Sequence, residues 1–329
     1  MSDQKNQVFL IWGGNGWIAG ILYEMLKTQG HKVYSTTIRM EDREAVLAEL
    51  NRIKPTHVLN CAGVTGRPNV DWCEDNKPAT VRANLIGTNN LADCCFLQGI
   101  HCTIYATGCI YAYDEKHPMG SGIGFTETDP ANFSGSYYSF VKAHAERMLV
   151  SAYEANTLIL RLRMPVSDDL NPRSFVTKIT KYDHVVDIPN SNSILTDLLP
   201  CSVKLAQEKV TGVYNFTNPG AISHNEVLSL YKQYVNPDFK WKNFSLDEQA
   251  KVIKAGRSNC ELDTTKLVNK MREFNMEIPN VHEAYAQCFQ RMAAGKRQHQ
   301  GAGENKENVA STSSKAAELG VVESVSLVK

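Results

Sequence analysis

A tyrosine and a lysine four residues apart are the first candidates for chemistry. Tyr138 and Lys142 lie in the stretch GSYYSFVKAHAE, residues 135–146, where we expect a helix to begin. A separation of four residues places both side chains on one helical face. A nearby ammonium favours tyrosinate and lowers the phenol's pKa, which leaves a proton donor that is useful near neutral pH. A surface tyrosine that packs on a lysine side chain has the same spacing. Whether the pair is catalytic therefore depends on whether the rest of the chain brings a cofactor and a substrate to it.

The composition is that of an ordinary globular protein and excludes several classes. The chain has 329 residues, 43% hydrophobic and 21% charged, with a formal net charge of +0. No overall charge attracts nucleic acid or an anionic membrane, and no apolar run reaches the ~20 residues that span a bilayer. The N-terminus lacks the layout of a signal peptide, and the 9 cysteines form no CxxC pair. We therefore expect a cytoplasmic protein with reduced thiols, and neither a disulfide framework nor a metal site.

Short apolar runs alternate with amphipathic stretches along the chain. The expected strands are residues 8–12, 32–37, 57–61, 101–106, 158–162 and 213–216, and the expected helices are 17–29, 43–53, 78–98 and 195–207. This alternation predicts an α/β fold of the Rossmann type, a doubly wound parallel sheet with helices on both faces.

Prolines interrupt this regular pattern from about residue 164 onward. We therefore expect an NADP-binding domain at residues 1–163 and a smaller C-terminal substrate-binding lobe at 164–292, partly interleaved with it. Residues 293–329 are polar, rich in glycine and serine, and without periodicity, which predicts a disordered tail.

A glycine loop joins the first expected strand to the first helix. Gly13 and Gly16 belong to GGNGWIA, residues 13–19, in which Trp17 and Ile18 open the helix. Glycines let the backbone approach a pyrophosphate, and the helix N-terminus supplies amide donors and a positive dipole end. A tight turn without a ligand is the alternative, but a loop on the first strand of such an alternation favours dinucleotide binding.

The end of the second expected strand bears on the choice of cofactor. Sites that prefer NAD usually place an acid there for the ribose hydroxyls. Residues 35–39 read STTIR and contain no acid. Arg39 is suited to pair with the 2′-phosphate of NADPH. We expect NADPH, with NADH as the alternative, because Arg39 is also explained as a solvated loop residue.

Taken together, the motifs resemble the extended short-chain dehydrogenases/reductases. Besides Tyr138 and Lys142, the positions that carry the resemblance are Gly13, Gly16, Cys61, Ala62, Gly63, Asn84 and Thr107. Longer stretches, among them residues 62–74, 105–125 and 237–259, resemble the eukaryotic nucleotide-rhamnose synthase epimerase/reductases, a group that includes the C-terminal domain of plant rhamnose synthases. The resemblance covers roughly residues 7–290.

The resemblance implies a UDP- or dTDP-linked 4-keto-6-deoxyhexose as substrate. Such enzymes epimerise C3 and C5 of the sugar and reduce the C4 ketone, which gives nucleotide-activated L-rhamnose. Tyr138 would protonate the C4 oxygen as hydride arrives from NADPH, Lys142 would hold the nicotinamide ribose, and Thr107 would hydrogen-bond the ketone. The further cofactor contacts that it implies are Cys61, Ala62, Gly63 and Asn84.

Epimerisation requires a base on one face of the sugar and an acid on the other. Cys109 lies two residues after Thr107, and a thiol of pKa ~8.5 is tuned toward neutral pH by a neighbouring cation. The resemblance gives Lys178, in SFVTKI, as its partner. Without the resemblance, Cys109 would be interpreted as a small buried side chain and Lys178 as a solvated one. A chain that only reduces, beside a separate epimerase, is the alternative within the family.

Polar side chains after residue 164 are candidates for binding the sugar nucleotide. Arg257, in the sequence GRSN, offers paired donors to a diphosphate. The family often has proline at position 256, and the glycine here is expected to loosen the backbone that places Arg257. The other candidates are Asn171, Arg173, Asn218, Ser223 and Glu226.

Two rival classes of function remain. Relatives of rhamnose reductases include regulatory subunits of methionine adenosyltransferase, which keep the fold and bind a partner without catalysis. Against this class, Thr107, Cys109, Tyr138 and Lys142 are all present. The second rival is an epimerase or dehydratase of another sugar nucleotide. A dehydratase would need an acidic pair after Thr107, where the chain has Gly108 and Cys109. A homodimer or a pathway-enzyme partner is expected only by analogy with such reductases.

Overall fold

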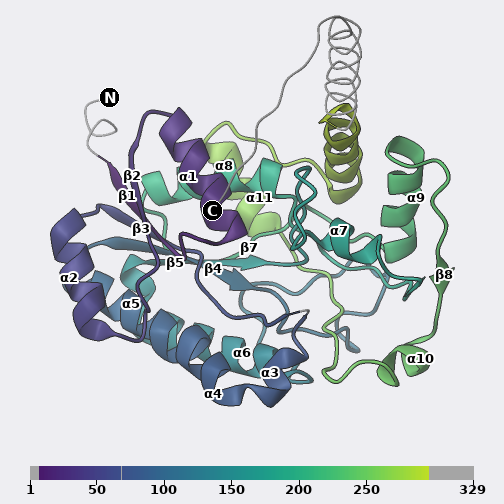
Figure 1. Ribbon diagram of the computed structural model, residues 1–329, viewed down its shortest axis with the longest axis horizontal. Helices are drawn as coiled ribbons and strands as arrows, with labels where there is room; N and C mark the ends of the chain where they lie inside the picture. The colour runs from purple at the N-terminus through teal and green to yellow at the C-terminus, as the bar shows by residue number, and fades with distance from the viewer. Residues whose placement is uncertain (1–6, 68, 296–329) are drawn as a thin grey trace, which may run out of the picture.

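Six parallel strands form the central sheet, in the order β2-β1-β3-β4-β5-β7 (Figure 1). The strands of this sheet are β1 (Val8–Trp12), β2 (Lys32–Thr36), β3 (His57–Asn60), β4 (His101–Thr107), β5 (Thr157–Leu162) and β7 (Gly212–Asn215). This computed structural model describes residues 7–67 and 69–295 of the chain. The predicted doubly wound parallel sheet is confirmed, and each predicted strand lies within a residue of the observed bounds.

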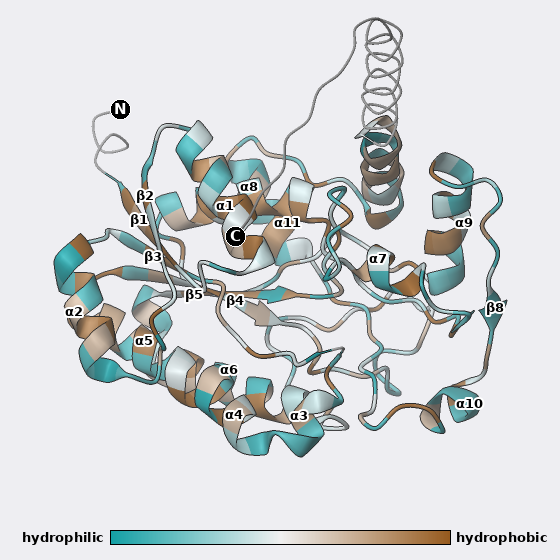
Figure 2. Cartoon of the chain, viewed as in Figure 1, coloured by the Kyte–Doolittle hydropathy of each residue, from teal (hydrophilic) through white to brown (hydrophobic). Residues whose placement is uncertain are grey.

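Helices cover both faces of the sheet (Figure 1). One face is packed by α1 (Trp17–Thr28), α8 (Leu195–Gln207) and α11 (Thr265–Glu273). The other is packed by α2 (Arg43–Ile53), α5 (Gly87–Leu97) and α6 (Tyr137–Tyr153), the last followed by the 3-10 turn η3 (Glu154–Asn156). Because both faces are covered, the central strands are largely buried, and β1 is a continuous apolar run that is brown in Figure 2. In the described ranges, no helix is long and apolar enough to cross a membrane.

The helix predicted at residues 78–98 is divided into three parts. The parts are α4 (Lys77–Val81), the π-helical turn η2 (Arg82–Ile86) and α5, and the short α3 (Trp72–Asp75) precedes them. The π turn carries Asn84, whose amide oxygen accepts a hydrogen bond from Val64 N at 2.9 Å and whose amide nitrogen donates to the Val64 carbonyl at 2.8 Å. A tertiary contact thus accompanies the change of helix geometry, which apolar spacing does not reveal.

The chain after residue 163 contributes to both parts of the molecule. α8, β7 and α11 complete the main sheet and its layers. The second lobe is built from α7 (Phe175–Ile179), α9 (His224–Tyr234), α10 (Leu246–Ala250) and a small sheet of β6 (His184–Val185) and β8 (Lys242–Asn243). Its core also includes a helix at residues 281–295. The tail expected from residue 293 therefore begins too early, and residues 296–329 lie outside the described part.

Candidate active site

The start of α6 is held by two acceptors from outside the helix. The Ser136 hydroxyl accepts a hydrogen bond from Ser139 N at 3.1 Å and caps the helix. The Glu74 carboxylate, on α3, accepts from Tyr137 N at 2.7 Å. Both contacts satisfy first-turn amides that have no partner inside the helix. The two reactive side chains of α6 therefore project from a fixed helix end.

Thr107 and Tyr138 meet where β4 ends beside α6. The Thr107 side chain is buried and forms a hydrogen bond with Tyr138, and its hydroxyl also accepts from Cys109 N at 3.1 Å. Burial raises the pKa of Tyr138, negative charge on Cys109 acts in the same direction, and the Thr107 contact opposes them. The prediction of a lowered phenol pKa is therefore wrong, because desolvation of the phenolate outweighs its stabilising contacts.

Lys142 lies in a buried row of charges along α6. Burial lowers the pKa of Lys142 to about 8, and Glu146, one turn further on, acts in the opposite direction. Glu146 is itself bound by Arg161 of β5, with 2.6 Å between the carboxylate and the guanidinium. Lys142 is thus a cation at pH 7 that loses its proton only slightly above neutrality.

The glycine loop closes against the turn after β3. Gly13 has a φ of 81°, and a Cβ there would lie 2.9 Å from the backbone of Ala62. Gly16 is the N-cap of α1, which has no side-chain cap and no acidic residue in its first turn. The amides at Trp17 and Ile18 therefore belong to a helix end that no side chain caps and whose first turn carries no acid, and this end fits the pyrophosphate of a dinucleotide.

Asn84 supports the cofactor loop from behind. It is 1% exposed, and both ends of its amide are bound by the Val64 backbone. A Cβ on Gly63 would lie 3.1 Å from the Asn84 amide oxygen, so the glycine permits this approach. The predicted cofactor contact of Asn84 is corrected to a positioning role. Cys61, in the same turn, is half-buried, and burial raises the pKa of its thiol.

A polar cavity of about 450 Å³ joins the N-terminus of α1 to the loop before α7. Trp17 Nε1 donates to the Asp169 carboxylate at 2.8 Å and connects the two segments. Asp169 also accepts from Asn171 N at 3.0 Å, and the Asn171 amide oxygen accepts from Arg173 N at 2.9 Å. The lining residues are Asn15, Gly16, Trp17, Gly20, Ile21, Arg67, Asp169, Asn171 and Arg173. Arg67 and Asp169 were not predicted, because no motif spacing marks them.

The C-terminal strap, residues 254–260, runs beside the start of α6. Arg257 forms an ion pair with Asp71 at 2.8 Å, so a diphosphate would compete with this carboxylate. Gly256 N donates to the Gly135 carbonyl at 2.8 Å, and a Cβ on Gly256 would lie 2.9 Å from the same oxygen. Glycine is required here by close approach, and the expected loosening of the backbone is wrong.

Cys109 and Lys178 stand on different elements. Cys109 follows β4, is half-buried, and interacts electrostatically with Tyr138. Lys178 is on α7, where burial and then the charge of Arg173 lower its pKa. Over the described residues, no hydrogen bond or ion pair joins Cys109 to Lys178. Their role as an acid–base pair stays a prediction.

Asn218 is part of the protein interior. It is 0% exposed, its amide oxygen accepts from Ile194 N at 2.9 Å, and its amide nitrogen donates to the Pro279 carbonyl at 3.2 Å. The predicted substrate contact is wrong, because no part of this side chain reaches the surface.

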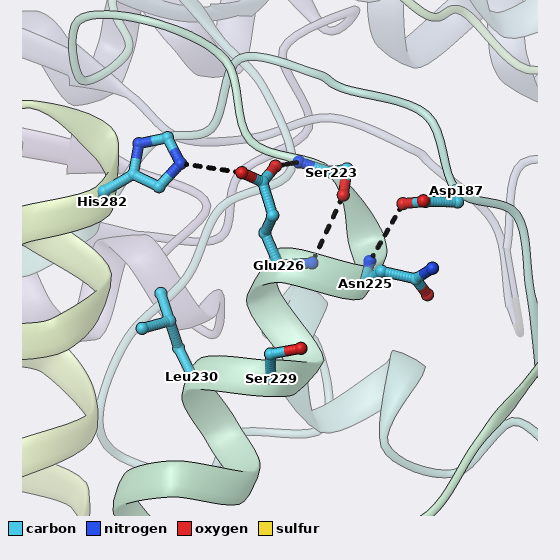
Figure 3. Close-up of a pocket in the computed structure, with 7 residues that line it drawn as sticks. All are labelled: Asp187, Ser223, Asn225, Glu226, Ser229, Leu230 and His282. Atoms are coloured by element: carbon cyan, nitrogen blue, oxygen red, sulfur yellow. Dashed lines mark hydrogen bonds and ion pairs between the residues drawn. The ribbon is translucent and has the colours of Figure 1, made fainter.

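Ser223 and Glu226 form the capping box of α9 and line a separate cavity. Ser223 N donates to the Glu226 carboxylate at 2.8 Å, and Glu226 also pairs with His282 at 3.2 Å. Figure 3 shows the cavity, of about 490 Å³, which these residues share with Asp187, Asn225, Ser229 and Leu230. None of Thr107, Tyr138 and Lys142 lines it. The predicted substrate role of Ser223 and Glu226 is therefore corrected to helix capping.

Residues 9–183 match the NAD dependent epimerase/dehydratase family. The chain belongs to this family. A bifunctional dTDP-4-dehydrorhamnose 3,5-epimerase/dTDP-4-dehydrorhamnose reductase of Arabidopsis thaliana is 54% identical over 83% of this chain and 90% of its own length. A trifunctional UDP-glucose 4,6-dehydratase/UDP-4-keto-6-deoxy-D-glucose 3,5-epimerase/UDP-4-keto-L-rhamnose-reductase of the same plant is 53% identical over 80% of this chain, which spans 40% of that relative.

Solved structures of this family share the fold. The L780 UDP-rhamnose synthase of Acanthamoeba polyphaga mimivirus has a TM-score of 0.80 and 36% identity, over 86% of this chain and 98% of that one. The dTDP-4-dehydrorhamnose reductase of Bacillus anthracis, in complex with NADP, has a TM-score of 0.71 and 21% identity, over 86% of this chain and 97% of that one. The resemblance drawn from the sequence motifs is confirmed.

Proposed function

We propose that this enzyme converts a UDP- or dTDP-linked 4-keto-6-deoxyglucose into nucleotide-L-rhamnose. It epimerises C3 and C5 and then reduces the C4 ketone with NADPH. The observation that carries the proposal is 54% identity to a bifunctional epimerase/reductase over 90% of that relative. The contact of Thr107 with Tyr138, beside a buried Lys142, supplies the chemistry that the reduction needs.

The reduction step uses three side chains of the site. Bound NADPH supplies the hydride for C4. Tyr138 is a neutral phenol at pH 7, because burial raises its pKa, and it donates its proton to the C4 oxygen. Thr107 donates a second hydrogen bond to the same oxygen and polarises the ketone. Lys142, cationic below a pKa of about 8, binds the ribose hydroxyls and stabilises the tyrosinate that remains.

Epimerisation uses the acidity of protons next to the ketone. The Cys109 thiolate takes the proton from C3 or C5, the C–H electron pair forms a double bond to C4, and the π pair of the C4 carbonyl moves to its oxygen. Hydrogen bonds from Thr107 and Tyr138 stabilise the resulting enolate. The Lys178 ammonium returns a proton to the opposite face of the same carbon. Exchange with water then restores the thiolate and the ammonium, so each inversion brings one solvent proton into the sugar.

The preference for NADPH rests on the end of β2. Ser35, Thr37 and Arg39 are all exposed there, and residues 35–39 include no carboxylate. A carboxylate at this position would accept from the ribose 2′-hydroxyl and repel a 2′-phosphate, whereas a guanidinium pairs with the phosphate. The same argument predicts that NADH binds this enzyme more weakly than NADPH.

The sugar nucleotide is assigned to the region around the polar cavity and the strap. Asn171 and Arg173 line the cavity next to Arg67, and two guanidinium groups suit a diphosphate. Arg257 becomes a third contact only if it exchanges Asp71 for phosphate oxygens. Asp71→Asn should therefore lower the KM for the sugar nucleotide while the KM for NADPH stays unchanged.

The experiment supplies the purified protein with UDP- or dTDP-4-keto-6-deoxyglucose and NADPH in deuterated water. Oxidation of NADPH together with nucleotide-rhamnose that carries deuterium at C3 and C5 is the expected result. Oxidation that occurs only with a pre-epimerised 4-keto-rhamnose substrate would leave a reductase that depends on a separate epimerase. An enzyme that oxidises NADPH with neither nucleotide would contradict the proposal, and the two nucleotides in parallel show which base is preferred.

A further inference from the structure

Arg163, directly after β5, is a buried cation without a carboxylate. It is 1% exposed, and its guanidinium donates to the Gly108 carbonyl at 3.0 Å, to Ser258 Oγ at 2.7 Å and to Asn190 Oδ1 at 2.5 Å. All of these acceptors are neutral, and its Nε has no partner. Across residues 7–67 and 69–295, no carboxylate forms an ion pair with Arg163.

Arg161, two residues earlier in the chain, shows the usual solution. Its guanidinium is equally buried, but the Glu146 carboxylate binds it at 2.6 Å. Buried charges are normally paired, since an isolated charge loses its hydration without compensation. The two arginines lie two residues apart in the chain, but only Arg161 is paired with a carboxylate. Any negative charge that compensates Arg163 must therefore come from another kind of group.

The groups around Arg163 that can become anions are thiols and a phenol. A Cβ on Gly108 would lie 2.9 Å from Arg163 Cγ, so the arginine stem packs against the residue that precedes Cys109. Burial opposes the charge of Arg163, but Cys260, Cys109 and Tyr113 act in the other direction and its pKa is raised. Tyr138, from α6, is the remaining titratable group that interacts with Cys109.

Only one of these groups is placed to ionise and to reach a substrate. Cys260 is fully buried, donates to the Gly108 carbonyl at 3.9 Å, and has its pKa raised to about 11 by burial. Burial likewise raises the pKa of Tyr113. Cys109 is half-buried and lies beside Thr107 and Tyr138, at the proposed position of the ketone.

We propose that Arg163 is a positioning residue that stabilises the thiolate of Cys109, the form in which this side chain acts as a base. The inference rests on the proposed function of Cys109 in epimerisation. The anion changes place during the reaction: the sulfur gains the proton of C3 or C5, and the negative charge passes to the C4 oxygen. Arg163 stays fixed behind Gly108 throughout, so no reorganisation of the protein is needed.

The test measures alkylation of Cys109 in the full-length protein by iodoacetamide, with mass spectrometry of the peptide that contains it. The ratio of the rates at pH 9 and pH 7 removes the effect of accessibility. An ordinary thiol accelerates about twentyfold between these values. We expect less than about threefold for the wild type, and a return to about twentyfold in Arg163→Met.

Two controls separate charge from architecture. Arg163→Lys keeps the cation and should keep the flat profile. Ser258→Ala removes one hydrogen bond of Arg163 but not its charge, and should leave the ratio within about twofold of the wild type. Equal ratios in the wild type and Arg163→Met would overturn the inference. A wild-type ratio near twentyfold would do the same even if Arg163→Met failed to fold.

Deuterium incorporation by Cys109→Ser distinguishes this inference from the proposed function. Full incorporation by that variant, with a flat wild-type alkylation profile, would remove Cys109 from epimerisation and leave the electrostatic role of Arg163 intact. Lost incorporation with a steep wild-type profile would retain Cys109 in the reaction and overturn the role of Arg163.

Discussion

Two halves of the site are built from different kinds of structure. The reducing half, Thr107, Tyr138 and Lys142, stands on β4 and on α6, a helix of 17 residues. The half that we propose to face the sugar nucleotide, residues 167–179, is a loop followed by α7, a helix of 5 residues. Tertiary contacts with Glu74 and Arg161 hold the first half, whereas the second combines local turns around Asp169 with an exposed hydrogen bond from Trp17.

The difference fits the two tasks. Hydride transfer requires a donor, a ketone and a proton source within a fixed geometry, and long buried elements provide it. A sugar nucleotide must enter and leave, and local unfolding is cheapest where few apolar contacts are lost. We therefore expect substitutions in the reducing half to damage catalysis or folding strongly, and substitutions in the sugar-facing half to change binding.

The largest effect is expected for Tyr138→Phe. Loss of the proton donor should lower the reduction rate about 10³-fold, because general acid catalysis contributes 10²–10⁴. Deuterium exchange at C3 and C5 should fall less, by about 10²-fold, since only one of the two hydrogen bonds to the enolate is lost. The two rates are measured by NADPH absorbance and by NMR of the sugar. Equal loss of both would show that the two steps share Tyr138.

The stability of the two halves should differ as well. Glu146→Gln leaves the buried Arg161 without its carboxylate and should cost about 3 kcal/mol of unfolding free energy. Asp169→Asn, at the exposed loop, should cost less than about 1 kcal/mol. Urea denaturation followed by circular dichroism measures both. Similar losses in the two variants would contradict the contrast between the halves.

Cys109→Ala should abolish exchange without abolishing reduction. We expect exchange at C3 and C5 to fall about 10²-fold, as for removal of a general base. Reduction of a substrate that is already epimerised should proceed at near the wild-type rate, because Tyr138 and Thr107 remain. Cys94→Ala is the control, since this free thiol lies on α5, outside the proposed site. Loss of exchange in that variant too would point to a general effect of thiol removal.

The pH dependence should isolate Lys142 within the reducing half. Burial lowers its pKa to about 8, so the side chain is cationic below this pH and neutral above it. The reduction rate should therefore fall above pH 8, about tenfold per pH unit. Stopped-flow measurements of the reduction rate at saturating NADPH, between pH 6 and 10, measure this decrease. In Lys142→Met the rate should be low and should not fall further above pH 8. If the same fall remained in this variant, another group would be responsible for it.

The smallest effect is expected at Arg39. Arg39→Ser removes the proposed partner of the 2′-phosphate and should raise the KM for NADPH about tenfold, with little change for NADH. Arg43→Ser is the matched control, because Arg43 is also partly exposed but is paired with Asp93 at 2.6 Å. If both variants kept the wild-type ratio of KM values, the cofactor preference would have to come from other residues.

The sequence correctly located the residues of the proposed reducing half in the fold, because the rules that place them are local or follow from sheet topology. Helical spacing put Tyr138 and Lys142 on one face, and parallel strands bring their carboxyl ends to one edge, where Thr107 lies. The glycine loop was recognisable for the same reason. The near-exact bounds of β1 and β5 follow from burial on both faces, which makes each of these strands a distinct apolar run.

The errors concern side chains whose fate depends on tertiary contacts. The side-chain amides of Asn218 and Asn84 are hydrogen-bonded to the backbone of the protein itself. Neither the residue type nor its spacing in the sequence distinguishes such an amide from one that is free to bind a ligand. The pKa of Tyr138 depends on how deeply the phenol is buried. Gly256 is explained by the nearness of Gly135, which no spacing within the sequence indicates.

The site is complete only when the C-terminal strap is present. Residues 254–260 contact the segment just before α6 through Gly256 and Gly135, and they reach Arg163 through Ser258. During synthesis on a ribosome, the reducing half is therefore incomplete until the strap has emerged. A fragment that ends at residue 163 would contain every residue of that half, yet it would lack a wall of the site. The chemistry belongs to a stretch of chain that cannot be cut out as an independent module.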